Sequence, residues 1–282
     1  MNIQISEFAP RDRLKPFVEL FWEGDFNMNS DGTLRQRVVP NGYVELVIHL
    51  TDLRCDLFKD NAWSQSPHYT IIGLHTQTYE VRFGSFVRVF GIRFKPEGFY
   101  DIFGMPAAEF GDTFDDMGSV LGKKFQAYSE RLKASGDLAE MLLLTEQYLM
   151  TQLEMRRFEE TYIHRAAELI RQSKGFARIE DLSKQVFVSA RQLERSFKQH
   201  LGVSPKFYMR IARLNKAQRL LETHPSLSLT QLSYECGYAD QAHFIHDFND
   251  FIGIRPKHFV KKRESFIVNA HLAVLAQPDT GF

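Results

Sequence analysis

Cysteine is scarce in this chain, and other features of exported or membrane proteins are missing as well. Two cysteines, Cys55 and Cys236, occur among 282 residues, too few for the disulfide framework of a small secreted protein. No apolar run approaches the roughly 20 residues that a membrane-spanning helix needs. Residues 1–10 have neither the basic start nor the apolar core of a signal peptide. We therefore expect a cytoplasmic protein with no membrane contact.

A net charge is also lacking, since 35 basic residues balance 35 acidic ones. The balance conceals a division of the chain. Residues 160–265 hold 18 Lys and Arg against 11 Asp and Glu, whereas the other residues hold 17 against 24. Clustered basic residues supply sequence-independent affinity for phosphates. The charges predict a basic module joined to an acidic one, and the length allows two domains.

Catalytic motifs are missing too, because the sequence has no glycine-rich phosphate loop and no nucleophile elbow. Metal-binding β domains need His and Glu clustered on adjoining strands. The only candidates are His49, His68, His75 and Glu45. Glu45 and His49 stand four residues apart, which is roughly 13 Å along a strand, too far to chelate one ion. We expect no enzymatic activity, no metal and no cofactor.

The last third of the chain, by contrast, contains one helix-turn-helix pattern twice. The first copy spans residues 179–205 and the second spans residues 229–256. Leu182 corresponds to Leu232, an offset of 50, and after the turn the offset is 51. The extra residue falls in a turn, where an insertion disturbs the packing least.

Each copy carries the signals of two short packed helices. In the second helix of the first copy, Leu193 and Phe197 are four residues apart and share one face. Phe244 and Phe248 repeat this spacing in the second copy. A short oxygen side chain, which caps free backbone N–H groups, precedes each of these helices, and a Gly-x-x-Pro sequence ends each one. The expected caps are Ser189 and Asp240.

Four segments in this region match one protein family. They are Leu193-Glu194-Arg195-Ser196-Phe197-Lys198, Gly202-Val203-Ser204-Pro205-Lys206-Phe207-Tyr208, residues 237–244 and residues 213–221. With them, residues 159–265 resemble the DNA-binding domain of AraC/XylS-type bacterial transcription regulators. The resemblance implies seven helices and two recognition helices that enter successive major-groove segments. It therefore implies double-stranded DNA as the partner, with two boxes about one helical turn, or roughly 34 Å, apart.

Base-reading residues are expected on the exposed face of each second helix. Arg pairs with guanine, Gln pairs with adenine, Glu accepts from cytosine, and apolar groups contact the thymine methyl. In the family, the positions of Arg191, Glu194 and Arg195 commonly face the groove. The candidates are Arg191, Gln192, Glu194 and Arg195 in the first copy, and Gln241, Ala242, Ile245 and His246 in the second.

The second copy departs from the family pattern, which usually has Arg at the position of His246 and Lys at that of Asn249. Residues 179–207 hold five basic and three acidic residues, whereas residues 229–259 hold two and four. We therefore predict that the first copy anchors DNA binding and that the second adds less. Contacts with phosphates position the protein without specifying sequence, and their candidates are Lys206, Arg210 and Arg213.

Residues 1–121 predict a β-rich domain. Apolar side chains alternate along residues 43–50, and residues 86–94 form another predicted strand. Several strands bounded by turns predict a sandwich or a barrel, and family members often carry a cupin-like β domain here that senses a small molecule. The turn signals are Asp31-Gly32, Pro40-Asn41-Gly42 (of the hairpin kind), Gly84-Ser85 and Lys95-Pro96-Glu97-Gly98.

A ligand pocket in this domain needs apolar walls and a few convergent polar groups. The residues that we expect there are Trp22, Tyr43, Glu45 and Arg93. The alternative for each of them is an ordinary place in the core.

Residues 122–158 predict a helical linker, because apolar residues recur there at spacings of three and four. This stripe either packs on the β domain or pairs with a second copy of itself, and the family analogy favours a helix pair that supports a homodimer. The stripe consists of Leu138, Met141, Leu142, Thr145, Leu149 and Leu153. We assign no role to the tail, residues 266–282.

The fold class is therefore α+β with several domains: a β-rich, cupin-like sensor domain followed by an all-α domain with two helix-turn-helix motifs. The function expected is sequence-specific DNA binding by a transcription regulator under the control of a small-molecule effector, with RNA polymerase as a further partner. The alternative is a DNA-binding regulator whose amino-terminal domain serves only dimerisation, without an effector.

Overall fold

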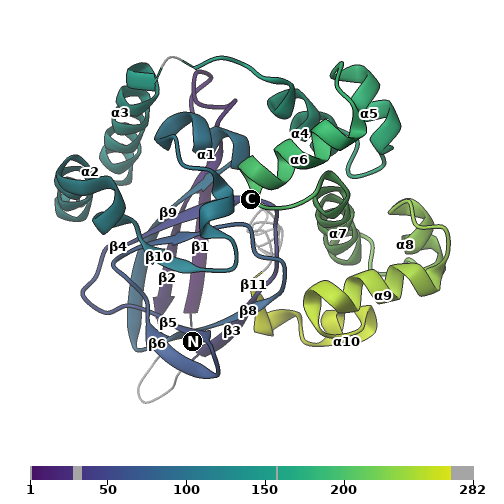
Figure 1. The fold of residues 1–282 in the computed structure, drawn as a ribbon. Helices are drawn as coiled ribbons and strands as arrows, with labels where there is room; N and C mark the ends of the chain where they lie inside the picture. Colours follow the sequence, from purple (N-terminus) through teal and green to yellow (C-terminus); the bar gives the residue numbers. More distant parts are fainter. Residues whose placement is uncertain (1, 28–33, 157, 268–282) are drawn as a thin grey trace, which may run out of the picture.

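The protein folds into a β domain followed by an all-α domain (Figure 1), as a computed structural model that describes residues 2–27, 34–156 and 158–267 shows. The predicted fold class is thereby confirmed. Within the described residues, no helix is long and apolar enough to cross a membrane.

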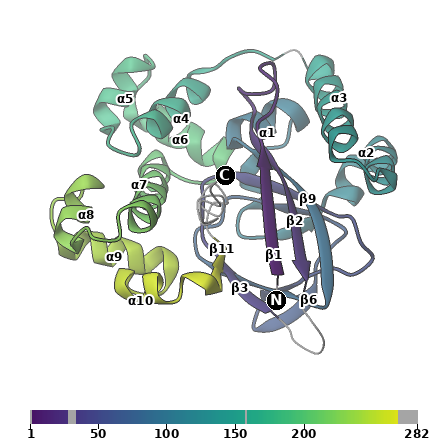
Figure 2. The ribbon, with the colours of Figure 1, turned by 180° about the vertical axis from the view of Figure 1, so that it is seen from behind.

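Two facing sheets make up the β domain, so the predicted sandwich, rather than a closed barrel, is what forms (Figure 2). Their inner faces meet in an apolar cluster that includes Val47, Leu57 and Val81. The first sheet has the order β1 (Asn2–Phe8), β2 (Val18–Asn27), β9 (Phe86–Phe94), β4 (Val44–His49), β7 (Tyr69–Ile72) and β10 (Phe114–Asp116). The second has the order β11 (Phe266–Ile267), β3 (Leu34–Val38), β8 (Tyr79–Phe83), β5 (Asp56–Lys59) and β6 (Ala62–Gln65).

The predicted strands at residues 43–50 and 86–94 are confirmed as β4 and β9. All six residues of β4 are buried. Leu46 and Ile48 pack in the large core cluster that includes the helices, whereas Glu45 and His49 line the space between the sheets. Because helices cover one face and the second sheet covers the other, the polar positions of this strand face a buried space instead of water.

Two of the predicted turns, Pro40-Asn41-Gly42 and Lys95-Pro96-Glu97-Gly98, do not join paired strands. The first forms no hairpin, because β3 pairs with β8 while β4 pairs with β7 and β9. It carries the chain from one sheet to the other, as Gly84-Ser85 does between β8 and β9. Lys95-Pro96-Glu97-Gly98 is the start of helix α1 (Pro96–Phe103), since the fixed φ of proline suits a first helical turn. Asp31-Gly32 lies outside the described residues.

The predicted helical linker consists of two helices, α2 (Met117–Ala134) and α3 (Leu138–Arg156). The start predicted at residue 122 coincides with a break inside α2, where Gly122 adopts a φ of 68°. The apolar stripe of α3 is used within the chain: Met141 and Leu149 are fully buried in one cluster with Phe125 of α2 and Phe99 of α1. Within one chain, the stripe therefore packs against α1 and α2, and its pairing with a second copy stays a prediction.

Seven α-helices follow in residues 158–267, as the family resemblance implies. Ser189 and Asp240 cap two of them by accepting from the backbone N–H groups of Gln192 and His243. The helices are α4 (Tyr162–Gln172), α5 (Ile179–Gln185), α6 (Ala190–Leu201), α7 (Pro205–Thr223), α8 (Leu229–Glu235), α9 (Gln241–Ile252) and α10 (Pro256–Lys261). The two helix-turn-helix units, α5–α6 and α8–α9, are therefore confirmed.

Strand β11 lies where we assigned the tail no role, and it belongs to both domains. Phe266 is buried in the core of the second helix-turn-helix unit, beside Phe259. Phe266 and Ile267 then pair in parallel with Arg37 and Val38 of β3. The chain thus returns from the helical domain to complete a sheet of the β domain; residues 268–282 lie outside the described part.

Buried ion pairs join α1 of the β domain to α4 of the helical domain. Arg171 contacts Glu97, which is 3% exposed, and donates to the hydroxyl of Tyr208 on α7 at 3.1 Å. His164 Nε2 lies 2.7 Å from Asp101 Oδ2. Burial opposes the charged imidazolium, but the hydrogen bond to Asp101 and its charge outweigh this effect and raise the pKa of His164. Both pairs hold α4, the first helix of the helical domain, against the β domain.

We expect Arg171→Met to lower the free energy of unfolding by about 3–5 kcal/mol, because it leaves the buried carboxylate of Glu97 without its cation. The measurement is urea-induced unfolding of the full chain. Arg165→Met, on the same helix, is the matched control. Its partner Glu168 lies 3.4 Å away and both side chains are exposed, so we expect the free energy of unfolding to fall by less than about 1 kcal/mol.

Adding Glu97→Gln to Arg171→Met removes the uncompensated charge, and most of the lost stability then returns. A double variant as unstable as the single one would contradict a role for charge and leave only packing as the cause.

Candidate DNA interface and ligand cavity

The second helices of the two units, α6 and α9, are placed alike relative to the β domain. Beyond the end of α6, a Cβ added at Gly202 would lie 3.0 Å from Ala108. Near the end of α9, the backbone oxygen of Phe251 accepts from the N–H and the hydroxyl of Thr78, at 3.2 and 2.7 Å. The opposite ends lie beside α5 and α8, away from the sheets (Figure 1). The amino-terminal turns of both helices are therefore the ends open to a partner.

On α6, all four predicted base-reading residues are exposed: Arg191, Gln192, Glu194 and Arg195. Glu194 lies 3.4 Å from Lys198 in an exposed pair one turn apart. Since exposed pairs of this kind contribute little stability, both side chains stay available to a base edge.

On α9, the predicted residues are less available. Ala242 and His246 are exposed, and His246 Nδ1 lies 3.3 Å from Asp250. Gln241 accepts a 2.7 Å hydrogen bond from Thr230 of α8, and Ile245 packs on the apolar core. Fewer of the predicted base-reading side chains are therefore free on α9 than on α6.

The predicted phosphate contacts also differ from one another. Lys206 is exposed at the start of α7. Arg210 is held by Asp247 at 2.9 Å and by Asp250 at 3.1 Å. Arg213 lies over the ring of Tyr238, with its Cζ 4.9 Å from the ring centroid. Lys206 is therefore the least engaged of the three, whereas the two arginines tie α7 to the second unit.

A group of potential metal ligands, His246, Asp247 and Asp250, occurs on α9, with ligand atoms within 4.8 Å of one another. The guanidinium of Arg210 already contacts both carboxylates. This cation takes the place that a metal ion would need, so the group fits an ion pair better than a metal site.

Sequence reasoning missed two phenylalanines near the turns. Phe187 is 94% exposed and has a φ of 57°; it corresponds, at the offset of 50, to Gly237, whose φ is 73°. A Cβ at Gly237 would lie 2.3 Å from the ring of Phe176, which follows α4. The ring of Phe176 also lies 4.6 Å from Nζ of Lys216 on α7. Phe176, which lies between α4 and the first unit, thus packs on the turn of the second unit, and the glycine at position 237 is the sequence signal for this contact.

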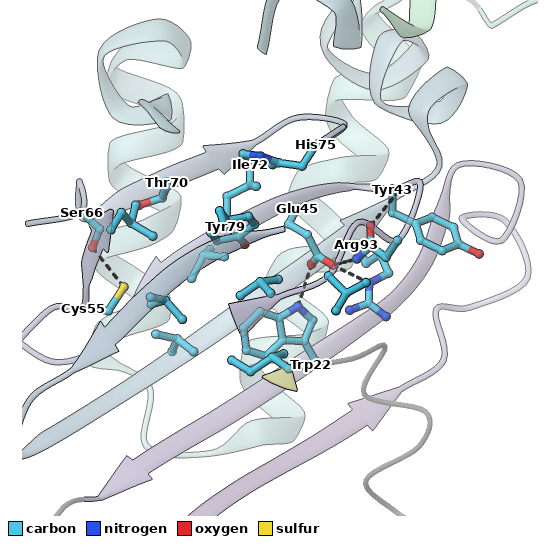
Figure 3. A pocket seen from close by; sticks show the side chains of 18 of the residues that line it. Trp22, Tyr43, Glu45, Cys55, Ser66, Thr70, Ile72, His75, Tyr79 and Arg93 are labelled. Atoms are coloured by element: carbon cyan, nitrogen blue, oxygen red, sulfur yellow. Dashed lines mark hydrogen bonds and ion pairs between the residues drawn. The ribbon is translucent and has the colours of Figure 1, made fainter. Parts of the chain in front are cut away.

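A cavity of about 110 Å³ lies between the two sheets, and Trp22, Tyr43, Glu45 and Arg93 all line it (Figure 3). Glu45 accepts from Trp22 Nε1 at 2.9 Å and from Arg93 Nε at 2.5 Å. The indole lies across Gly91, where a Cβ would come within 2.0 Å of it. Gly91 therefore allows Trp22 to reach Glu45, and the structure brings the predicted polar groups together.

The other end of the cavity holds a hydrogen-bonded group without charge. His49 Nε2 lies 3.5 Å from Cys55 Sγ and 3.3 Å from Ser66 Oγ. Burial lowers the pKa of His49 to about 4 and raises the pKa of the Cys55 thiol to about 11. His49 and Glu45 thus have separate hydrogen-bond partners. The raised thiol pKa also makes Cys55 a poor nucleophile.

Parts of the cavity wall contact the DNA-binding domain directly. Ile267 of β11 lines the cavity, and its neighbour Phe266 is part of the helical core. Asn41, which donates to Glu45 at 3.1 Å, accepts a 2.8 Å hydrogen bond at its backbone oxygen from Asn215 of α7. A change in the cavity therefore has short covalent and hydrogen-bonded connections to the helices.

Comparison with known proteins divides the chain in the same way. Residues 6–115 match a family described as "Domain of unknown function (DUF6597)", and residues 182–262 match one described as "Helix-turn-helix domain". Over 78 residues the chain is 37% identical to the HTH-type transcriptional regulator ArgR of Pseudomonas aeruginosa, covering 28% of this chain and 23% of that protein. Over 88 residues it is 35% identical to the activator RhaS of Salmonella paratyphi B, covering 31% of each.

Solved structures give similar neighbours. ToxT from Vibrio cholerae is 9% identical with a TM-score of 0.48, over 86% of this chain and 98% of that one. An AraC-type regulator from Chromobacterium violaceum is 33% identical with a TM-score of 0.34, over 36% of this chain and 91% of that one.

The chain spans less than a third of the length of the curated relatives it matches. These relatives are named as regulators and not as enzymes. With its two capped helix-turn-helix units and the segment that matches them, the chain belongs to the AraC/XylS family.

Proposed function

We propose that this protein is a transcription regulator that binds specific DNA with both helix-turn-helix units. The observation that carries the proposal is that α6 and α9 both present their capped amino-terminal turns away from the β domain. Recognition helices contact base edges with these turns. The surplus of basic residues in residues 160–265 adds attraction to phosphates. A regulator of this kind acts on DNA in the bacterial cytoplasm. RNA polymerase would be its further protein partner.

Contacts of the second unit with α7 and with Phe176, which precedes the first unit, support binding to two boxes at a fixed spacing. Phe176 packs against Gly237, and Arg210 holds Asp247 on α9. A rigid pair gains from linkage, because the second box is bound at a high effective concentration once the first is occupied.

The cavity supports control by a small-molecule effector. Its walls are mostly apolar with a few polar groups, as in small-molecule sites, and Ile267 and Asn41 connect it to the helical domain. A homodimer stays a prediction. The apolar stripe of α3, on which this prediction rests, packs against helices of the same chain.

Selection of sites from random duplex DNA by the full-length protein tests the proposal. We expect two enriched short boxes about one helical turn apart, with an affinity that falls steeply as salt rises. Salt-sensitive binding without an enriched sequence would replace the regulator by a non-specific DNA-binding protein.

Gly237→Ala tests the fixed spacing. The added Cβ collides with Phe176 and strains a φ of 73°, so affinity for the two-box duplex falls roughly tenfold or more while affinity for either box alone changes little. Gly253→Ala is the matched control, because it has a φ of 77° but no atom within 4 Å of the new Cβ. Equal effects of both variants on the two-box duplex would show that backbone strain alone is responsible.

Arg195→Ala and His246→Ala test which unit anchors the complex. Arg195 is exposed on a basic unit, whereas His246 lies beside the carboxylate of Asp250. We expect Arg195→Ala to weaken operator binding by about 1–3 kcal/mol and His246→Ala to have the smaller effect, measured by titration of the selected duplex at one salt concentration. The reverse order would make the second unit the anchor.

A further inference from the structure

The charges in the cavity wall are already compensated. Among the described residues that line it, Glu45 and Arg93 are the ones charged at neutral pH. Glu45 Oε1 accepts from Arg93 and Asn41, and its Oε2 accepts from Trp22. Arg93 Nη1 also lies 3.8 Å from Glu7 Oε1. An anionic ligand would add a third carboxylate around one guanidinium, and a cationic ligand would compete with three donors for one carboxylate.

One of the residues that line the cavity, His75, has a buried ring nitrogen without a partner among the described residues. The residue is 9% exposed, and its Nε2 is buried with no hydrogen bond to any described residue. Its Nδ1 lies 3.5 Å from Asp112 Oδ1, and a neutral ring that carries its proton on this side has a lone pair on Nε2. Burial lowers the pKa of His75 to about 4 in spite of Asp112, so the ring is neutral at pH 7.

Aromatic neighbours hold this ring in place. The centroid of His75 lies 4.5 Å from that of Tyr79 and 5.0 Å from that of Phe114. A buried acceptor without a donor is costly, and a ligand that donates to it removes that cost. The volume of about 110 Å³ is comparable with the roughly 150 Å³ of an apolar cavity that holds benzene.

From these observations we propose that the effector is a small, uncharged and mostly apolar molecule with one hydrogen-bond donor, such as a hydroxyl group, that binds His75 Nε2. The proposal rests on the proposed function of the cavity as an effector site and adds the chemistry of the ligand. The apolar walls bind the body of the molecule, and His75 selects its polar end.

Four probes of matched shape test this chemistry with the full-length protein: 4-methylphenol, toluene, 4-methylbenzoate and 4-methylbenzylamine. We expect 4-methylphenol to bind roughly five- to tenfold more tightly than toluene, the gain typical of one neutral hydrogen bond. Both charged probes bind at least about tenfold more weakly than 4-methylphenol. Dissociation constants from ligand-observed NMR titration give the ratios. Tighter binding of either charged probe, or no binding of any of the four, overturns the proposal.

His75→Phe separates the hydrogen bond from the packing. The phenyl ring keeps the stacking on Tyr79 and Phe114 but has no acceptor, so the preference for 4-methylphenol over toluene disappears while toluene binding is retained. His68→Phe is the matched control, because His68 does not line the cavity; it leaves the preference unchanged. A preference that survives His75→Phe overturns the assignment of the acceptor.

Titration of the selected DNA without any probe distinguishes the two levels of inference. Intact DNA binding together with failed probe selectivity overturns only the ligand chemistry. Loss of sequence-specific DNA binding overturns the proposed function itself.

Discussion

The buried contact among Glu97, Arg171 and Tyr208 is the constraint on which the arrangement of this protein depends. These residues come from α1, α4 and α7, so one guanidinium joins the β domain, the first helix of the DNA-binding domain and the helix between its two units. Glu97 has almost no access to water, and a carboxylate in such a place needs its cation nearby. The junction therefore behaves as part of the core and not as a flexible linker, and the first helix-turn-helix unit shares one apolar cluster with the sheets.

The two units are attached to the β domain by different means. The first has its helices in the common core, whereas the second has a separate apolar cluster that Val39 and Phe266 join from outside the seven helices. The second unit thus contacts the cavity side of the molecule through Thr78 and β11. This asymmetry adds to the difference in charge between the units. The unit with fewer free side chains at the predicted base-reading positions is also the one that contacts the cavity side.

Local signals account for what could be predicted. The caps Ser189 and Asp240, and the spacing of Leu193 and Phe197, act within a few residues, so the helix-turn-helix units follow from the sequence. Polar residues in apolar strands marked Trp22, Glu45 and Arg93, and the structure places them together. Distant partners explain the rest. Whether Pro40-Asn41-Gly42 joins paired strands depends on β8, and whether Arg210 is free depends on Asp247, 37 residues away. The two residues of β11 are too few for a periodic pattern.

The position of β11 sets the order in which the molecule can be completed. A ribosome makes the β domain first, yet the residue that closes one side of its cavity, Ile267, lies beyond the whole DNA-binding domain. During synthesis, one edge of β3 therefore stays unpaired until α10 and then β11 have left the ribosome. An amino-terminal fragment lacks this wall for the same reason, so the cavity of an isolated β domain differs from the cavity of the complete chain.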